Sequence, residues 1–428
     1  MQRYLLHLFL VGGRMILNRF GNKIVYENAV SLAPLLCHRC QNSNRRLFYT
    51  YYSEHFNENV TYCLNCVHLG AMTNQTPLKA IDIESTMDRC HYALKFELSE
   101  AQRRASDAIV DATASCKNVL LNAVTGSGKT EITFASIKAA RQAGKRVAFI
   151  APRIDVVKEV YMRLREAFSA TRIDLKYDGV KIEFEHQFLV ATVQQLYNYK
   201  THFDLIIVDE TDAFPLTTDD ELMRAITHAA TDVHSIIFMT ATPSKRMMRF
   251  LGEHETIAIA KRYHGHPLAI PDTYWMNIIK DIRKGKPSNY LIHLLASIVQ
   301  KERKVLVFVP EIELMHMLEG ILNQHFENIT SVYSGDDARY TKVEAMRESH
   351  IKILLTTTIL ERGVTFPFLD VIVIGADYYD FSSLMQICGR VGRKIEDPHG
   401  HIYFFSEFNT LGIKKTIRTI KELNGVEI

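Results

Sequence analysis

The sequence lacks a long uninterrupted apolar run. The chain has 428 residues, 47% of them hydrophobic, yet no stretch reaches the roughly 18 consecutive apolar residues that a membrane-spanning helix needs. The opening segment, residues 5–11, is apolar but short, contains His7, and precedes Gly12-Gly13-Arg14 without a small-residue cleavage site. We therefore expect ordinary structure there and no signal peptide. Any contact with a membrane is expected to be peripheral.

The sequence also lacks a strong net charge. Lys and Arg number 51 against 48 Asp and Glu, which gives a net charge of +3. This balance is too small to indicate a nucleic-acid-binding protein by bulk charge, so any contact with DNA or RNA must come from local patches. A chain of this length is expected to form two or three domains.

A glycine-rich octapeptide separates the apolar run 119–121 from a helical-looking stretch at 131–140. Its glycines let the backbone turn N–H groups around a polyphosphate, and a helix N-terminus adds a positive dipole end. A lysine at 129 suits the β- and γ-phosphates, and a threonine hydroxyl at 130 suits Mg²⁺. Alanine replaces the usual first glycine. The octapeptide predicts an ATP-binding phosphate loop formed by Ala123, Val124, Thr125, Gly126, Ser127, Gly128, Lys129 and Thr130.

Cysteine is scarce, and four of the seven cysteines form two pairs, Cys37-x-x-Cys40 and Cys63-x-x-Cys66. A nucleotide-binding loop implies a reducing cytosol, where this spacing favours Zn²⁺ over disulfides. Residues 47–52 between the pairs are typical of a strand. We predict a structural zinc ribbon, because four thiolates leave no open position for a catalytic water. Losing one ligand is expected to destabilise only the first 70 or so residues. Arg39, Arg45, Arg46 and the tyrosines nearby fit either nucleic acid or a solvated surface.

The region around the phosphate loop alternates apolar strands with helices. Strands are expected at 147–150, 188–192, 204–210 and 236–240, with a helix at 154–168. Such continuous apolar strands predict a parallel sheet covered on both faces. Upstream, Ser99 is expected to cap a helix in which Gln102 contacts adenine or simply lies at the surface.

An acidic pair ends one of these strands. Ligands of parallel sheets collect where the strands end, and Asp209 and Glu210 follow the apolar run 204–208. Asp209 is expected to hold Mg²⁺ with Thr130. Glu210 is expected to orient and deprotonate the attacking water.

A second alternating series follows residues 264–287, which we interpret as the inter-domain region. Its strands are expected at 305–309, 329–333, 351–357, 371–374 and 401–405, without a second phosphate loop. It contains Thr357 followed by Arg362-Gly363, and Gln386-x-x-Gly389-Arg390-x-Gly392-Arg393. Arg390 and Arg393 are expected at the start of a helix, where they would neutralise charge on the transferred phosphoryl group.

Four motifs in this order resemble those of the superfamily 2 helicases and translocases: residues 126–130, 209–212, 240–242 and 386–393. The resemblance covers residues 95–428 and implies two RecA-like parallel-sheet α/β lobes that bind ATP and a single nucleic-acid strand. It implies that Gln386 belongs to the nucleotide site. It also implies that Arg153, Thr192, Thr242 and Thr357 contact the strand or couple the lobes.

The four-cysteine module joined to residues 151–155 and 209–215 is similar to the ComFA family, the late-competence DNA-uptake ATPases of Gram-positive bacteria. This resemblance implies a cytoplasmic motor at the inner membrane face, with single-stranded DNA, a membrane DNA channel and other competence proteins as partners. Residues 357–367 also resemble the primosomal replication-restart helicases, which carry more zinc-binding cysteines. DEAD-box RNA helicases fit less well, because their last motif begins with His where this chain has Gln386.

The expected organisation has three parts. Residues 1–94 hold the Cys₄ zinc module at 37–66, residues 95–262 form the ATP-binding lobe, and residues 263–428 form the C-terminal helicase lobe. The expected activity is DNA-dependent ATP hydrolysis that drives single-stranded DNA translocation during uptake. The non-catalytic alternative is a nucleotide-gated DNA clamp or scaffold, which would need neither Glu210 nor Arg390 and Arg393. A basic C-terminal stretch, Lys414-Lys415-x-x-Arg418-x-x-Lys421, is either an exposed helix face or a surface for anionic lipid or a partner.

Overall fold

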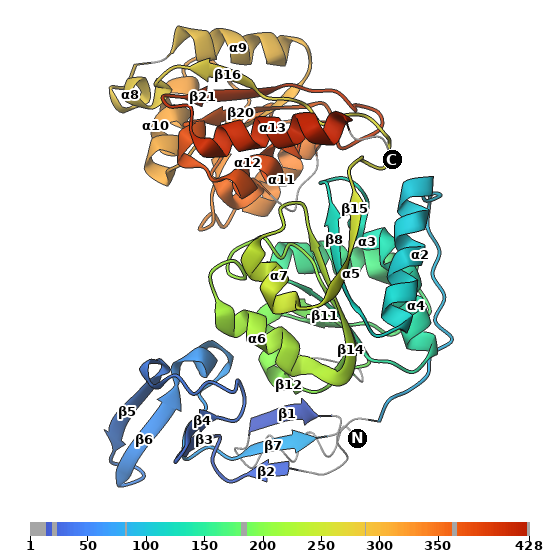
Figure 1. Ribbon diagram of the computed structural model, residues 1–428. Helices are drawn as coiled ribbons and strands as arrows, with labels where there is room; N and C mark the ends of the chain where they lie inside the picture. Colours follow the sequence, from blue (N-terminus) through green and yellow to red (C-terminus); the bar gives the residue numbers. More distant parts are fainter. Residues whose placement is uncertain are drawn as a thin grey trace. The chain divides into compact units, whose positions relative to one another are not determined.

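The computed structural model describes residues 14–18, 24–81, 84–180, 186–286, 288–361 and 366–425 (Figure 1). The apolar segment 5–11 and the pair Arg362 and Gly363 lie outside these residues. Contacts divide the chain into two compact units. The first comprises residues 1–97, 104–121 and 130–257, and the second comprises 98–103, 122–129 and 258–428.

A seven-stranded sheet forms the centre of the first lobe. Its order is β10 (Asp174–Lys176), β11 (Phe188–Thr192), β9 (Val147–Ala151), β13 (Phe203–Val208), β14 (Ala230–Thr240), β8 (Asn118–Ala123) and β15 (His254–Ile259). The four pairings from β10 to β14 are parallel. Every residue of β9, β11 and β13 is buried, as expected for a sheet covered on both faces. The parallel sheet is confirmed, whereas β10 and β15 were not predicted.

Helices cover both faces of this sheet. On one face, Ile150 and Ile206 share a core with Leu222 of α6 (Asp220–Ala229) and Met247 of α7 (Lys245–Leu251). On the other, α4 (Phe134–Gln142) and α5 (Ile154–Ala167) contact β9. Helix α5 forms where the apolar spacing predicted it. Helix α2 (Glu100–Ala114) begins as predicted, because Ser99 Oγ accepts the Gln102 N–H at 3.3 Å.

The N-terminal region builds small antiparallel hairpins and joins the first lobe. Strands β3 (Val30–Leu32) and β4 (Leu35–Cys37) form one hairpin, and β5 (Phe48–Ser53) and β6 (Glu58–Cys63) form another, which confirms the strand predicted near 47–52. A four-stranded sheet has the order β12 (Tyr199–Lys200), β1 (Arg14–Asn18), β7 (Leu78–Ile81) and β2 (Ile24–Tyr26). Because β12 belongs to the first lobe, the ribbon is not an independent module.

A fully parallel six-stranded sheet forms the second lobe. Its order is β16 (Asp272–Trp275), β21 (Ile402–Ser406), β20 (Leu369–Ile374), β17 (Lys304–Phe308), β19 (Ile353–Thr356) and β18 (Ile329–Val332). Alternate residues of β17 face opposite sides. Val305 and Val307 pack with α8 (Ile278–Arg283), α9 (Asn289–Gln300) and α10 (Ile312–Leu322). Leu306 and Phe308 pack with α11 (Arg339–Arg347), α12 (Phe381–Cys388) and α13 (Leu411–Gly425).

The interpretation of residues 264–287 as an inter-domain region was wrong for residues 272–283. Strand β16 and helix α8 both lie within it and belong to the second lobe. Strand β16 was missed because, as an edge strand, it lacks the continuous apolar run of a central strand: none of its four residues is fully buried. Within the described ranges, no helix combines the length and apolar content needed to cross a bilayer.

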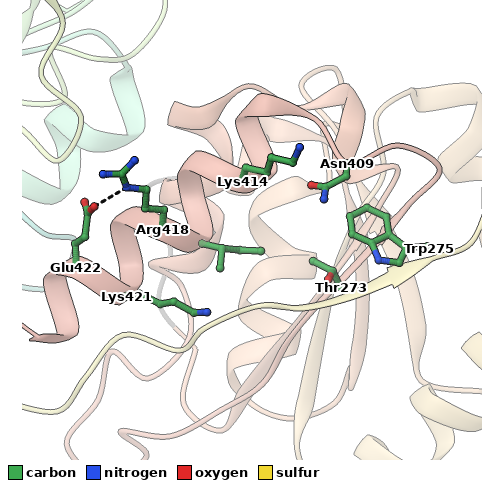
Figure 2. Close-up of a pocket in the computed structure, with 8 residues that line it drawn as sticks. Thr273, Trp275, Asn409, Lys414, Arg418, Lys421 and Glu422 are labelled. Atoms are coloured by element: carbon green, nitrogen blue, oxygen red, sulfur yellow. Dashed lines mark hydrogen bonds and ion pairs between the residues drawn. The ribbon is translucent and has the colours of Figure 1, made fainter.

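The second lobe has an open hollow of about 390 Å³ between β16 and α13 (Figure 2). Trp275, 51% exposed, lies at one end, and Lys414, Arg418 and Lys421 border the hollow. Arg418 Nε pairs with Glu422 Oε1 at 2.7 Å, one helical turn away. Lys415 packs elsewhere, with its Nζ 4.0 Å from the ring centroid of Phe381. The basic stretch is therefore divided between two surfaces.

Candidate nucleotide-binding and metal sites

The phosphate loop leaves the end of β8 and leads into α3 (Lys129–Ile132). Gly126 and Gly128 have φ of +80° and +75°, a backbone region that favours glycine. Lys129 is half-buried and Thr130 is buried. The helix expected at 131–140 is interrupted at Thr133, whose hydroxyl donates to the Thr130 carbonyl at 2.7 Å and so competes with the helical backbone bonds. The loop thus has the backbone shape that the sequence predicted.

Gln102 is buried, which excludes the surface interpretation. Its Oε1 accepts the Ser99 N–H at 2.8 Å, completing a reciprocal cap at the start of α2. Its Nε2 donates to the Ser127 carbonyl at 2.8 Å. The side chain therefore ties the helix N-terminus to the phosphate loop. The adenine contact stays a prediction.

The acidic pair lies at the end of β13. The Asp209 N–H donates to the Ile150 carbonyl at 2.8 Å, and Asp209 Oδ1 accepts the Glu210 N–H at 2.8 Å. Glu210 has φ of +50°, an uncommon conformation for a residue with a side chain. Such conformations cluster at functional sites. Glu210 therefore lies just after β13, at the edge of the sheet where ligands of such folds bind.

Arg163 on α5 interacts electrostatically with Asp209 and was not predicted from the sequence. Its Nη1 lies 3.6 Å from Glu131 Oε1 on α3. Although desolvation opposes the charge, the carboxylates of Glu159, Glu131 and Asp209 raise the pKa of the Arg163 guanidinium. Arg163 therefore adds a positive charge that interacts with Asp209, the expected Mg²⁺ ligand. An arginine on an amphipathic surface helix is common, so the sequence alone did not indicate a role for Arg163.

A hydrogen bond links the acidic segment to the segment after β14. Thr242 Oγ1 donates to Asp212 Oδ2 at 2.6 Å, and the Thr242 N–H donates to Thr240 Oγ1 at 2.9 Å. Thr240 is fully buried and Thr242 nearly so. This bond therefore ties the end of the acidic segment, residues 209–212, to residues 240–242.

The arginine motif of the second lobe lies at the end of α12, where Gln386 is buried. The expectation that Arg390 and Arg393 begin a helix is wrong, because they follow its last residue, Cys388. Gly392 has φ of +65°, and a Cβ there would lie 2.3 Å from the Pro398 carbonyl, so the turn requires glycine. Arg390 is buried and its Nε donates to the Glu361 carbonyl at 2.8 Å. Arg393 is more exposed.

The candidate DNA contacts differ in accessibility. Arg153 is half-buried before α5, and Thr192 ends β11, in register with Ala151 of β9. Both therefore lie at the carboxyl edge of the first sheet. Thr192 is buried, so its side chain is placed to stabilise the following turn and not to contact DNA. Thr357 is half-buried after β19 in the second lobe.

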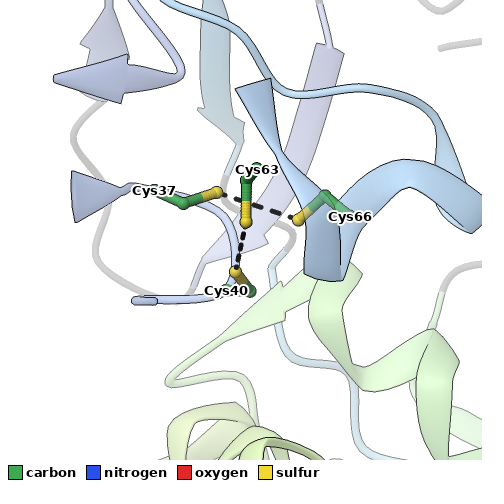
Figure 3. Close-up of side chains that lie close together, drawn as sticks. All are labelled: Cys37, Cys40, Cys63 and Cys66. Atoms are coloured by element: carbon green, nitrogen blue, oxygen red, sulfur yellow. Dashed lines mark hydrogen bonds between the residues drawn. The ribbon is translucent and has the colours of Figure 1, made fainter. Parts of the chain in front are cut away.

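The four paired cysteines converge on one point (Figure 3). Their sulfurs all lie within 4.8 Å of one another, with Cys37 to Cys66 at 3.8 Å and Cys40 to Cys63 at 3.5 Å. Tetrahedral Zn–S bonds of about 2.3 Å place sulfurs about 3.8 Å apart. All four residues are buried, and Asn42 Nδ2 donates to Cys63 Sγ at 3.6 Å. The donor set therefore fits one tetrahedral Zn²⁺.

The basic and aromatic residues of the ribbon fall into two groups. Arg39 is buried: its Nη1 donates to the Leu69 carbonyl at 3.0 Å and its Nη2 to Asn198 Oδ1. It therefore fastens the ribbon to the first lobe and does not face DNA. Arg45 and Arg46 are exposed, as are Tyr49, Tyr51 and Tyr52 on β5.

Replacing Cys63 with alanine should reduce bound zinc from one ion to none, because tight structural binding needs all four thiolates. The cysteines share one apolar core with Leu196 and Leu216 of the first lobe. The loss should therefore lower the melting temperature of that lobe as well, by several degrees or more, and not only that of the first 70 residues. Elemental analysis and thermal unfolding measure both effects.

Cys116→Ala is the matched control, since this cysteine lies outside the cluster, and it should keep both zinc and stability. Wild-type protein purified under reducing conditions without zinc would refute the metal centre.

Sequence comparison identifies similar families and relatives. Residues 14–80 match the family described as "Competence protein ComFA N-terminal domain". Residues 95–245 match "Type III restriction enzyme, res subunit", and 286–394 match "Helicase conserved C-terminal domain". "Competence protein ComFA" of Streptococcus pneumoniae is 34% identical over 400 residues, 91% of this chain and 90% of that protein. Its Bacillus subtilis counterpart is 32% identical over 411 residues, 94% and 88% of the two chains.

Solved structures share the fold at low sequence identity. S. cerevisiae Dbp5 bound to RNA and ADP BeF3 superposes with a TM-score of 0.54 at 14% identity, covering 77% of this chain and 93% of that chain. RecG bound to a three-way DNA junction gives a TM-score of 0.53 at 17% identity, covering 77% and 47%. The chain thus has the two parallel-sheet α/β lobes of helicases, preceded by a cysteine cluster that suits a zinc ribbon.

Proposed function

Because the chain belongs to the ComFA family of competence proteins, we propose that it is an ATP-driven single-stranded DNA translocase that acts in DNA uptake during transformation. The proposal rests on the similarity of about nine-tenths of the chain to two competence proteins. Residues 286–394 also match a helicase domain. We propose the boundaries 1–94, 95–262 and 263–428 for the zinc-bearing region and the two lobes.

The phosphate loop and Gln102 bind ATP in this proposal, and Gln386 contributes from the second lobe. Lys129 neutralises the phosphates, and Thr130 and Asp209 hold Mg²⁺. Glu210 takes the proton of the attacking water, for which its place at the end of β13, beside Asp209, is suited. Arg390 and Arg393 are the candidates for stabilising the transferred phosphoryl group. Each donates its Nε to a backbone carbonyl, but Arg393 is the more accessible of the two because Arg390 is buried. Zn²⁺ holds the ribbon and takes no part in hydrolysis.

The DNA partner is bound without base readout. Incoming DNA has arbitrary sequence, so contacts to phosphates suit the task and contacts to base edges do not. Arg153 is the most accessible candidate for contacting DNA phosphates in the first lobe. Thr192 and Thr357 position the turns that follow their strands. We further propose a cytoplasmic location at the inner membrane face, beside a DNA channel and other competence proteins. The hollow bordered by Lys414, Arg418 and Lys421 is a candidate for that contact.

Single-stranded DNA should stimulate ATP hydrolysis by the purified full chain, and duplex DNA of the same length should stimulate it much less. Stimulation should be similar for unrelated sequences and should fall steeply as salt rises, because phosphate contacts release counterions. A steady-state ATPase assay across these DNAs measures it. Equal stimulation by duplex, or strong preference for a forked substrate, would refute the translocase and favour the restart-type helicase.

A further inference from the structure

Arg262 belongs to none of the motifs above, yet it is an unusual residue. Its side chain is 3% exposed. Nη1 donates to the Gly392 carbonyl at 2.6 Å, whereas Nε and Nη2 have no acceptor among the described residues. Buried N–H groups nearly always have a partner, and a buried cation needs one more than a neutral group does. An anionic partner from outside the chain would satisfy both unmatched donors and the charge of this guanidinium.

The neighbouring backbone places this guanidinium beside the phosphate loop. The Tyr263 N–H donates to the Gly126 carbonyl at 3.2 Å. A Cβ built on Gly126 would lie 3.8 Å from Arg262 Cδ and 3.9 Å from its Nε, which is ordinary van der Waals contact. The unmatched donors therefore lie next to a loop whose shape suits a polyphosphate.

The local charges favour a phosphate partner. Burial, followed by the positive charge of Arg393, lowers the pKa of the Arg262 guanidinium to about 10. The Cys388 thiol acts in the opposite direction and raises this pKa. Among the described residues, no carboxylate is a cause of the shift in the Arg262 pKa. Arg262 is still charged at neutral pH. A bound polyanion would therefore compensate the buried charge of Arg262.

We propose that Arg262 is an additional phosphate-binding residue of the nucleotide site, whose Nε and Nη2 donate to oxygens of a bound nucleoside di- or triphosphate. The proposal rests on the proposed function, since it needs ATP to bind at this loop. A guanidinium presents its donors as a planar fork that matches two phosphate oxygens, which a lysine cannot do. Arg262 would thus complement the point charge of Lys129.

The test compares wild type, Arg262→Gln and Arg262→Lys as full-length proteins, with Lys261→Gln as the matched control. Lys261 is the preceding residue and is exposed, so its replacement removes the same charge from the surface. Calorimetric titration with ADP and with inorganic pyrophosphate measures affinity, and pyrophosphate separates phosphate contacts from adenine contacts. Arg262→Gln should weaken both by about tenfold or more, Arg262→Lys by less, and Lys261→Gln by less than twofold.

Thermal unfolding without nucleotide distinguishes phosphate binding from a purely structural role. The Gly392 carbonyl also accepts from His264 Nε2 at 3.0 Å, so it keeps a partner in the variants. Replacing an uncompensated buried cation by a neutral amide should leave the melting temperature unchanged or raise it. The proposal would be overturned if Arg262→Gln were less stable than wild type but bound ADP and pyrophosphate with affinities within twofold of wild type. If Arg262→Gln fails to fold, the same criterion is applied to Arg262→Lys. If wild type bound neither ligand, the nucleotide site itself would be refuted.

Discussion

Replacing Glu210 by glutamine should leave ATP binding close to wild type and slow hydrolysis by about a hundredfold or more. The substitution keeps the shape of the side chain and removes the carboxylate that accepts the proton of the attacking water. The Glu210 N–H bond to Asp209 Oδ1 is a backbone interaction and survives the change. Binding of a fluorescent ATP analogue, followed by single-turnover hydrolysis, measures the two effects separately.

Two further variants serve as comparisons for Glu210→Gln. Lys129→Ala should weaken binding and turnover together, since the lysine is expected to meet the phosphates in the bound and transition states alike. Glu253→Gln, at an exposed glutamate in the loop before β15, should change neither. Normal turnover in Glu210→Gln would show that another group serves as the base.

Replacing Arg393 by alanine should lower the turnover number by about a thousandfold, with a much smaller change in ATP affinity. An arginine that acts on charge developing during phosphoryl transfer contributes more to the transition state than to the bound ATP. Arg390→Ala should also reduce turnover. Because Arg390 is buried and holds the Glu361 carbonyl, it should lower the melting temperature too. Steady-state kinetics and thermal unfolding of both variants separate the two roles.

Arg283→Ala is the matched control, because this arginine is exposed and pairs with Glu311 at 3.2 Å on the surface. It should leave turnover unchanged. A defect in Arg393→Ala confined to ATP affinity would assign that residue to binding or structure.

The central strands and the motifs could be predicted because their signals are local. The apolar run 204–208 followed by Asp209 and Glu210 predicts a buried parallel strand with acidic residues at its end, and β13 forms there. Edge strands carry no such signal. Strand β16 has no fully buried residue, and so its region was mistaken for a connector.

The supporting residues of the site could not be predicted, because their roles depend on contacts distant in sequence. Arg262 is 130 residues from Gly392, to which it donates, and Arg39 is 159 residues from Asn198. No spacing rule relates such pairs. Loss of a zinc ligand was expected to destabilise only the first 70 or so residues. The cysteine spacing predicts the metal ligands but not the lobe residues that pack against them.

Transformation frequency in cells that carry a chromosomal Glu210→Gln allele tests the central claim most directly. Immunoblotting would first establish that the variant accumulates to the wild-type level, and growth would be followed in parallel. If the chain is an ATP-driven motor of DNA uptake, transformation by added DNA should fall to near the level of a gene deletion while growth is unchanged. Intact transformation together with a growth defect would contradict the uptake function and favour a role in replication restart.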